Sequence, residues 1–102
     1  MGKSIKLENG SEIVLPNEGM DLAKGINIDT LMVIDYLSQD NNYVIGMDLA
    51  KPNTKDISTY ILSRKKDGVN EILLHRTNKD SKALEEEVRN LSKYFDAPIH
   101  EF

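Results

Sequence analysis

The chain contains no cysteine, and it contains no long run of apolar residues. The absence of cysteine excludes disulfides, thiol nucleophiles and zinc–thiolate sites. The longest uninterrupted apolar run, residues 31–34, is far too short to cross a membrane. The first residues also lack the apolar stretch that a secretory signal requires. These absences predict a cytoplasmic protein without a membrane segment.

An excess of positive charge is also missing. The 102 residues include 13 Lys and Arg against 17 Asp and Glu, which gives a formal net charge of −4. Proteins that bind nucleic acid without sequence preference usually present a basic face, so nucleic acid is not an expected partner. The hydrophobic share of 39% and the charged share of 29% are typical of a globular chain. This length predicts a single domain over residues 1–102.

The hexapeptide GMDLAK occurs twice, at residues 19–24 and 46–51. An apolar run precedes each copy, and at the same offset Ile34 matches Ile61. Internal repetition of this kind predicts a duplicated β unit. A Gly-Asp turn could also offer backbone N–H groups to a phosphate, but neither copy has the further glycines of a P-loop. A packing role for the repeat is therefore favoured.

Apolar stretches separated by turn residues predict three β-hairpins, over residues 4–15, 29–50 and 57–76. The pairs Asn9-Gly10 and Asp67-Gly68 are strong hairpin turns, because both of their positions tolerate positive φ. Pro16, Gly19 and Gly25 predict a loop over residues 16–28.

The second hairpin predicts a cation site. With Asn41-Asn42 as the turn, Asp35 lies directly opposite Asp48. Facing carboxylates repel unless water, a cation or a shared proton relieves them. We therefore take Asp35 and Asp48 as candidate metal ligands, with two solvated carboxylates or a shifted register as the alternative.

The third hairpin predicts a ligand site. A turn at Asp67-Gly68 pairs Arg64 with Glu71, Leu62 with Leu73 and Tyr60 with His75. A basic tip with an aromatic neighbour could hold a phosphorylated ligand. The candidate residues are Arg64, Lys65, Lys66, Tyr60 and His75. The alternative is a solvated tip that guards against edge pairing, with His75 packed on Tyr60 at the sheet surface.

The sequence predicts a single helix, over residues 80–96. Asp80 or Ser81 is a suitable N-cap, and Pro98 ends the helix near Asp96. Apolar residues recur at helical spacing at Leu84, Val88, Leu91 and Phe95. The expected fold is α+β, an antiparallel meander of five to six strands with this amphipathic helix packed on one face. The tail, with Ile99 and Phe102, is expected to dock on the sheet edge or on a partner.

Between Leu31 and Phe95 the chain reads LMVIDYLSQDNNYVIGMDL, then STYILSRKKDGVNEILLHRT, then DSKALEEEVRNLSKYF. In this order of segments it resembles the small acidic YrzB-like domains of Bacillota, whose function is uncharacterised. The resemblance implies a fold and a cytosolic setting, and it implies no active-site residues.

No motif assembles a nucleophile, a base and an oxyanion site, so we expect no enzyme and no cofactor. Large apolar residues on both faces of the third hairpin, with one helix to cover them, predict an interaction module. It would bind a protein partner or itself, as a homo-oligomer, through an edge strand or the second apolar face. The alternative is an inhibitor or sequestering protein of phage or mobile-element origin, which captures a phosphorylated nucleotide or blocks a defence or nucleic-acid enzyme.

Overall fold

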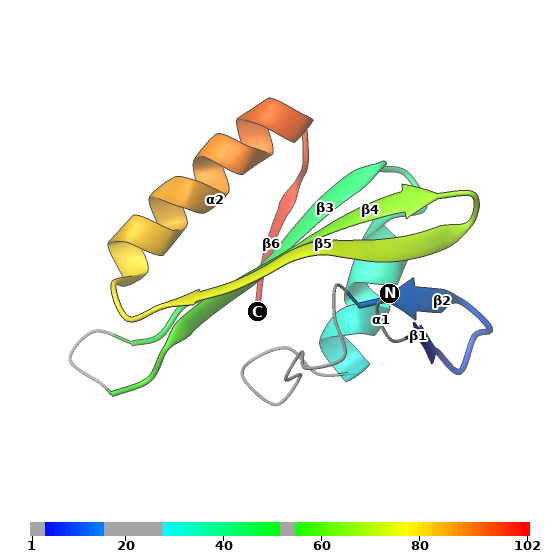
Figure 1. Ribbon diagram of the computed structural model, residues 1–102, viewed down its shortest axis with the longest axis horizontal. Helices are drawn as coiled ribbons and strands as arrows, with labels where there is room; N and C mark the ends of the chain where they lie inside the picture. The colour runs from blue at the N-terminus through cyan, green and yellow to red at the C-terminus, as the bar shows by residue number, and fades with distance from the viewer. Residues whose placement is uncertain (1–3, 16–27, 52–54) are drawn as a thin grey trace.

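The computed structural model describes residues 4–15, 28–51 and 55–102. Its described part is α+β, with a six-stranded mixed sheet and two helices (Figure 1). The elements are β1 (Ser4–Lys6), β2 (Glu12–Val14), α1 (Ile28–Leu37), β3 (Tyr43–Asp48), β4 (Ser58–Lys66), β5 (Val69–Asn78), α2 (Ser81–Phe95) and β6 (Ile99–Glu101). Their order in the sheet is β1-β2-β5-β4-β3-β6.

The α+β class is confirmed, but the antiparallel meander is only partly right. The pairs β1–β2, β3–β4 and β4–β5 are antiparallel, as expected of hairpins and neighbours. However, β2 pairs with β5 in parallel, and β6 pairs with β3 in parallel. Parallel neighbours cannot be joined by a tight turn, so each pair is linked through other elements of the chain. The predicted loop 16–28 lies outside the described residues except for Ile28, which begins α1.

The predicted hairpin over residues 29–50 is wrong, because its first arm is helix α1. Leu31 and Ile34 are both fully buried, and this spacing places them on one face of a helix. Ile34 is therefore helical whereas Ile61 lies in β4, so the two segments are not copies of one β unit. The first GMDLAK copy lies outside the described residues.

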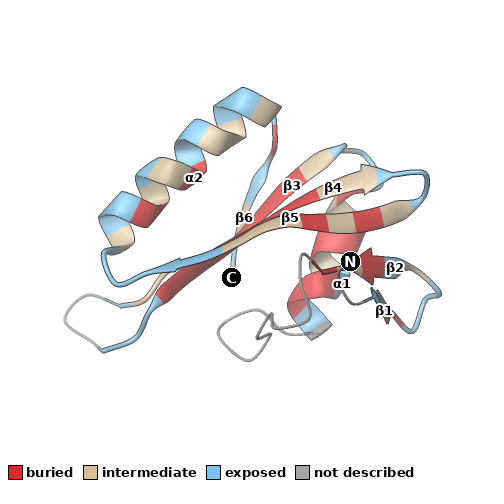
Figure 2. Ribbon diagram, in the orientation of Figure 1, coloured by how far each residue is buried: buried red, intermediate tan, exposed pale blue. Residues whose placement is uncertain are grey.

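Each face of the sheet is covered by one helix, α1 on one side and α2 on the other (Figures 1 and 2). The cluster on the α1 face contains Leu7, Ile13, Leu15, Leu31, Ile34, Val44, Ile61 and Ile72. The cluster on the α2 face contains Ile45, Met47, Tyr60, Leu62, Leu84, Val88 and Ala97. Both faces of the third hairpin are therefore covered. The premise of an uncovered second face is wrong, because α1 covers it.

The third hairpin has the predicted turn and the predicted Arg64–Glu71 pair. Beyond that pair, a β-bulge shifts the register by one residue, so that Leu62 pairs with Leu74. Leu73 and Leu74 consequently both pack against the α2-face cluster. The predicted pairings of Leu62 with Leu73 and of Tyr60 with His75 are wrong for this reason.

The first hairpin, β1–β2, is present, but its loop is longer than the Asn-Gly pair. The Leu7 N–H donates to Ser11 O at 2.8 Å, and the Gly10 N–H donates to Leu7 O at 3.0 Å. Gly10 has a φ of 90°, and Asn9 does not share the positive φ that a two-residue turn requires. The loop geometry places the Asn9 side chain toward α1, where it meets Asp35.

Helix α2 matches the prediction closely. The Asp80 carboxylate accepts hydrogen bonds from the Lys82 and Ala83 N–H groups, as an N-cap does. The helix ends at Phe95, and the next residue, Asp96, is its C-cap with a left-handed φ of 53°. The tail then docks on the sheet edge as β6, with the Phe102 N–H donating to Met47 O at 2.8 Å. Within the part of the chain that the structure describes, neither helix has the length and apolar content to cross a membrane.

Gly46 is the site of a tight contact between β3 and the C-terminal residue. A Cβ at this position would meet a Phe102 ring carbon at 2.8 Å and the Ile34 side chain at 3.0 Å. We expect Gly46→Ala to lower the free energy of unfolding by about 1–3 kcal/mol, because overpacking displaces the ring. Chemical denaturation measures this cost. In a Phe102→Ala background the same change should cost less, and an equal cost in both backgrounds would contradict the packing argument.

Candidate functional site

The predicted metal ligands Asp35 and Asp48 do not face each other. Asp35 lies on α1 and is 3% exposed, and its carboxylate accepts from Asn70 Nδ2 at 2.7 Å and Asn9 Nδ2 at 3.0 Å. Asp48 lies at the end of β3, opposite Thr59. The facing pair required a strand where the chain forms a helix. Within residues 4–15, 28–51 and 55–102, no group of three or more His, Asp or Glu residues could hold a metal ion.

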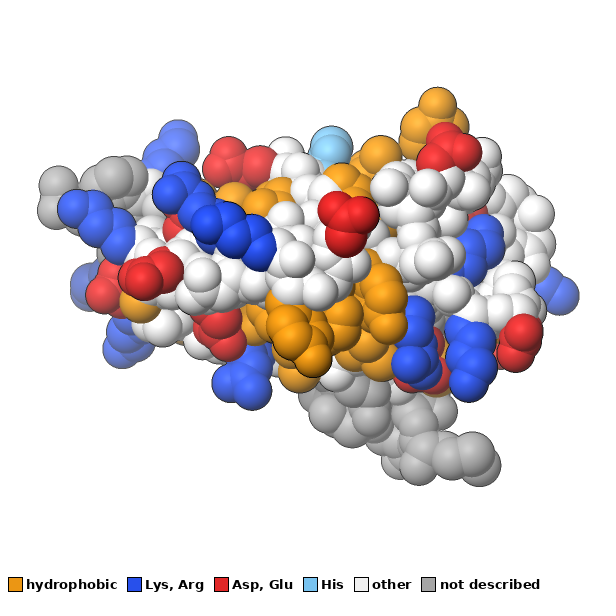
Figure 3. All heavy atoms as spheres, turned by 90° about the horizontal axis from the view of Figure 1, so that it is seen from above, with side chains coloured by type: hydrophobic (Ala, Val, Ile, Leu, Met, Phe, Trp, Pro, Cys, Tyr) orange, Lys and Arg blue, Asp and Glu red, His pale blue; other side chains and the backbone are white. Residues whose placement is uncertain are grey.

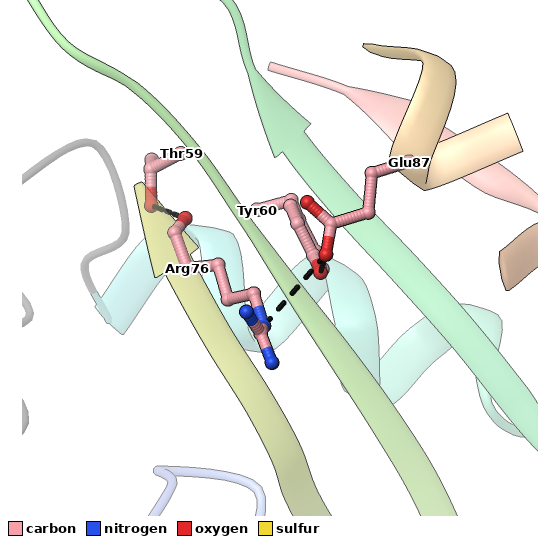
Figure 4. Close-up of polar contacts among 4 residues, drawn as sticks. All are labelled: Thr59, Tyr60, Arg76 and Glu87. Atoms are coloured by element: carbon pink, nitrogen blue, oxygen red, sulfur yellow. Dashed lines mark hydrogen bonds and ion pairs between the residues drawn. The ribbon is translucent and has the colours of Figure 1, made fainter. Parts of the chain in front are cut away.

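Tyr60 lies beneath α2 rather than at the surface. It is fully buried, and its hydroxyl donates to Glu87 Oε1 at 3.0 Å (Figure 4). The same carboxylate oxygen lies 3.7 Å from Arg76 Nε. Burial, together with the hydrogen bond to Glu87, raises the pKa of Tyr60 above its ordinary value. Tyr60 therefore joins the sheet to α2 and is not available to a ligand at the hairpin tip.

His75 lies on the other face of the sheet, because it pairs with Ile61 of the α1-face cluster. Its Nε2 lies 3.1 Å from Thr59 Oγ1, while the Thr59 hydroxyl donates to Arg76 O at 3.1 Å. The Thr59 hydroxyl is therefore shared between His75 and Arg76 O, and the tautomer of His75 sets which group donates in the contact between them.

The basic tip is separate from both of these residues. Arg64 pairs with Glu71 at 2.9 Å, and its buried Nε has no hydrogen-bond partner among the described residues. Lys65 is half-buried and Lys66 is exposed at the end of β4. The five predicted ligand-binding residues are therefore divided between the tip, the α2 face and the α1 face.

The structure instead brings three aromatic rings together at the C-terminal end of α2. Tyr43 lies 4.8 Å from Phe95 between ring centroids, and Phe95 lies 4.8 Å from Tyr94 in an edge-to-face arrangement. Tyr43 is also the cross-strand neighbour of Arg64. We call the group Tyr43, Arg64, Tyr94 and Phe95 the aromatic surface. It supplies the aromatic neighbour of Arg64 that the sequence had assigned to Tyr60.

The aromatic surface is open to solvent. Tyr94 is 81% exposed, and Tyr43, Phe95 and the neighbouring Leu91 are half-buried. Seen from the side of α2, hydrophobic side chains gather in a patch with basic side chains beside it (Figure 3). Exposed aromatic rings next to an arginine are the composition found at the centres of protein interfaces. This arrangement can bind another apolar surface.

Part of the aromatic surface could be predicted from the sequence. Phe95 belongs to the apolar stripe of the predicted helix, and Tyr94 precedes it on the edge of that stripe. Tyr43 was not added, because registers were predicted only within each hairpin and not between residues 43–50 and 57–65. Only the pairing of β3 with β4 brings Tyr43 beside Arg64.

Comparison of the chain with protein-family models, with curated proteins and with solved structures gives no match. The resemblance to YrzB-like domains therefore stays a prediction.

The Tyr60–Glu87 bond predicts an alkaline loss of stability. The unfolded tyrosine ionises near its ordinary pKa of about 10, while the folded residue keeps its proton to higher pH. Because the unfolded state then binds fewer protons, the free energy of unfolding falls as pH rises above about 10. Tyr60→Phe should cost about 1 kcal/mol at neutral pH and make this alkaline decline shallower. Urea denaturation at a series of pH values tests both effects, and an unchanged decline would contradict the assignment.

Proposed function

We propose that this chain is a small cytoplasmic, non-enzymatic interaction module that self-associates through the aromatic surface. The observation that carries the proposal is the exposure of Tyr94, at 81%, within a cluster of three rings in contact. An aromatic side chain that leaves water on association contributes much of the binding energy of an interface.

The charges around the aromatic surface favour a second copy as the partner. A two-fold dimer brings the same patch from both subunits together, so a patch of one charge sign repels itself. Here Arg64 is already paired with Glu71 at 2.9 Å. The ion pair leaves the centre of the surface close to neutral, so two copies can meet without an unpaired charge at their contact.

The neighbouring strand edge supports association in the same region. Strand β2 pairs with β5 only at Asn70 and Glu71. Beyond Glu71, no strand among the described residues lies on the outer side of β5. Leu73 and Leu74 on this part of β5 are half-buried against the α2-face cluster. A partner on the aromatic surface would extend over these leucines and reach the edge of β5, where strand edges recruit other chains.

Capture of a phosphorylated ligand is the second candidate. Its support is the unpartnered Arg64 Nε among the described residues, together with Lys65, Lys66 and Tyr43, the cross-strand neighbour of Arg64. A phosphate would have to compete with Glu71 for Arg64. For this reason we place self-association first.

Tyr94→Ala should weaken self-association, because it removes the most exposed ring of the aromatic surface. We expect the dissociation constant to rise by at least about tenfold, as measured by sedimentation equilibrium. Tyr36→Ala is the matched control, since Tyr36 is 70% exposed but lies on α1, across the sheet. That control should change the constant by less than about twofold.

Two results would count against the proposal. The first is a wild-type protein that stays monomeric at micromolar concentration in native mass spectrometry. The second is equal weakening by Tyr94→Ala and Tyr36→Ala. Extra mass of nucleotide size in the native spectra would instead favour the second candidate.

A further inference from the structure

The Asn9-Gly10 dipeptide forms part of the contact between the first hairpin and helix α1. Both oxygens of the buried Asp35 carboxylate accept hydrogen bonds from amide groups, one from Asn9 and one from Asn70. Asn70 is fully buried in β5, whereas Asn9 is exposed in the β1–β2 loop. We call this three-residue arrangement the Asp35 tie. It joins α1, β5 and the β1–β2 hairpin through one carboxylate.

From this geometry we infer that Asn9 is a site of spontaneous deamidation that, once modified, breaks the Asp35 tie. Asparagine is among the chemically labile residues of proteins. The backbone nitrogen of the next residue can attack the side-chain carbonyl carbon, and glycine at that position offers the least steric hindrance. Asn9-Gly10 is the one Asn-Gly dipeptide in the sequence.

The reaction balances with water as its only co-reactant. The Gly10 nitrogen forms a bond to Asn9 Cγ, the Cγ–Nδ2 bond breaks, and ammonia leaves with the Gly10 proton. The product is a cyclic imide. Water then adds to either imide carbonyl and opens the ring, which leaves a carboxylate on an aspartate or an isoaspartate at position 9.

In the native loop, each of the reacting groups takes part in a hydrogen bond with another residue. The Gly10 N–H donates to Leu7 O at 3.0 Å, and Asn9 Oδ1 accepts from the Ser11 N–H at 3.0 Å. Asn9 Nδ2 donates to Asp35 at 3.0 Å. Attack by Gly10 therefore requires local opening of the loop, so the reaction reports how often the hairpin detaches. Because Asn9 is exposed, water can complete the second step.

The modified side chain cannot restore the tie. A carboxylate at position 9 has no N–H to donate, and it places a second negative charge beside the buried Asp35. The contact between the β1–β2 hairpin and α1 then becomes repulsive. We expect detachment of the hairpin to uncover more of the β5 edge, since β2 covers that edge at Asn70 and Glu71.

Incubation at mildly alkaline pH, followed by peptide mapping with mass spectrometry, tests the modification. We expect the acid form to accumulate at Asn9, several-fold more slowly in the folded protein than in denaturant. Asn90, which precedes Leu91 within α2, is the internal control and should stay unmodified in the folded protein. Retention of the Asn9 amide even in denaturant would overturn the inference, and so would equal rates in the folded and denatured protein.

Variants test the consequence. Asn9→Asp should lower the melting temperature by about 5–10 °C, and Asn9→Ala, which removes the donor without adding charge, should lower it less. Adding Asp35→Asn to Asn9→Asp restores a donor–acceptor pair and should recover part of the loss. An Asn9→Asp protein as stable as the wild type would overturn the inference. So would an Asp35→Asn change that deepens the loss in the double variant.

Discussion

The burial of β4 on both of its faces is the constraint on which the rest of the structure depends. Tyr60, Ile61 and Leu62 follow one another along this strand, and each is completely or almost completely shielded from solvent. Because successive side chains point to opposite faces, such a run requires an apolar cover on each side of the sheet. Helix α2 provides one cover, and α1 with the β1–β2 hairpin provides the other.

Local signals in the sequence were enough for the parts of the fold that depend on near neighbours. The Asp67-Gly68 turn, the Asp80 cap and the apolar stripe of α2 each act within a few residues. The identity of α1 was not predictable in this way. Its segment is apolar on nearly all sides, and a strand and a buried helix of that length look alike in sequence. The bulge in the β4–β5 register, after which Leu73 and Leu74 both pack against the α2-face cluster, likewise has no local signal in the sequence.

The candidate site likewise combines features that depend on near neighbours with features that depend on contacts between distant segments. The sequence offered Tyr60 as the aromatic neighbour of the basic tip because Tyr60 and Arg64 lie on one strand, but the structure places Tyr60 beneath α2 and Tyr43 opposite Arg64. Tyr43 takes that place only through the pairing of β3 with β4, and Tyr94 and Phe95 reach it only because α2 crosses the sheet. Asp35 illustrates the opposite error. A carboxylate that seemed unsatisfied in a hairpin is fully occupied by two amides once its segment becomes a helix.

The two parallel pairings at the sides of the sheet have a kinetic consequence. Strands β4 and β5 are joined by a two-residue turn. The parallel pairings of Ile13 with Asn70 and of Ile45 with Ile99 instead join residues that are far apart in the sequence. The entropy lost on closing a loop grows with its length, so distant pairings form late in folding. The central ribbon should therefore assemble first and the outer strands last. Until β6 is added, the edge of β3 stays open, and a chain in that state can pair with its neighbours in a crowded solution.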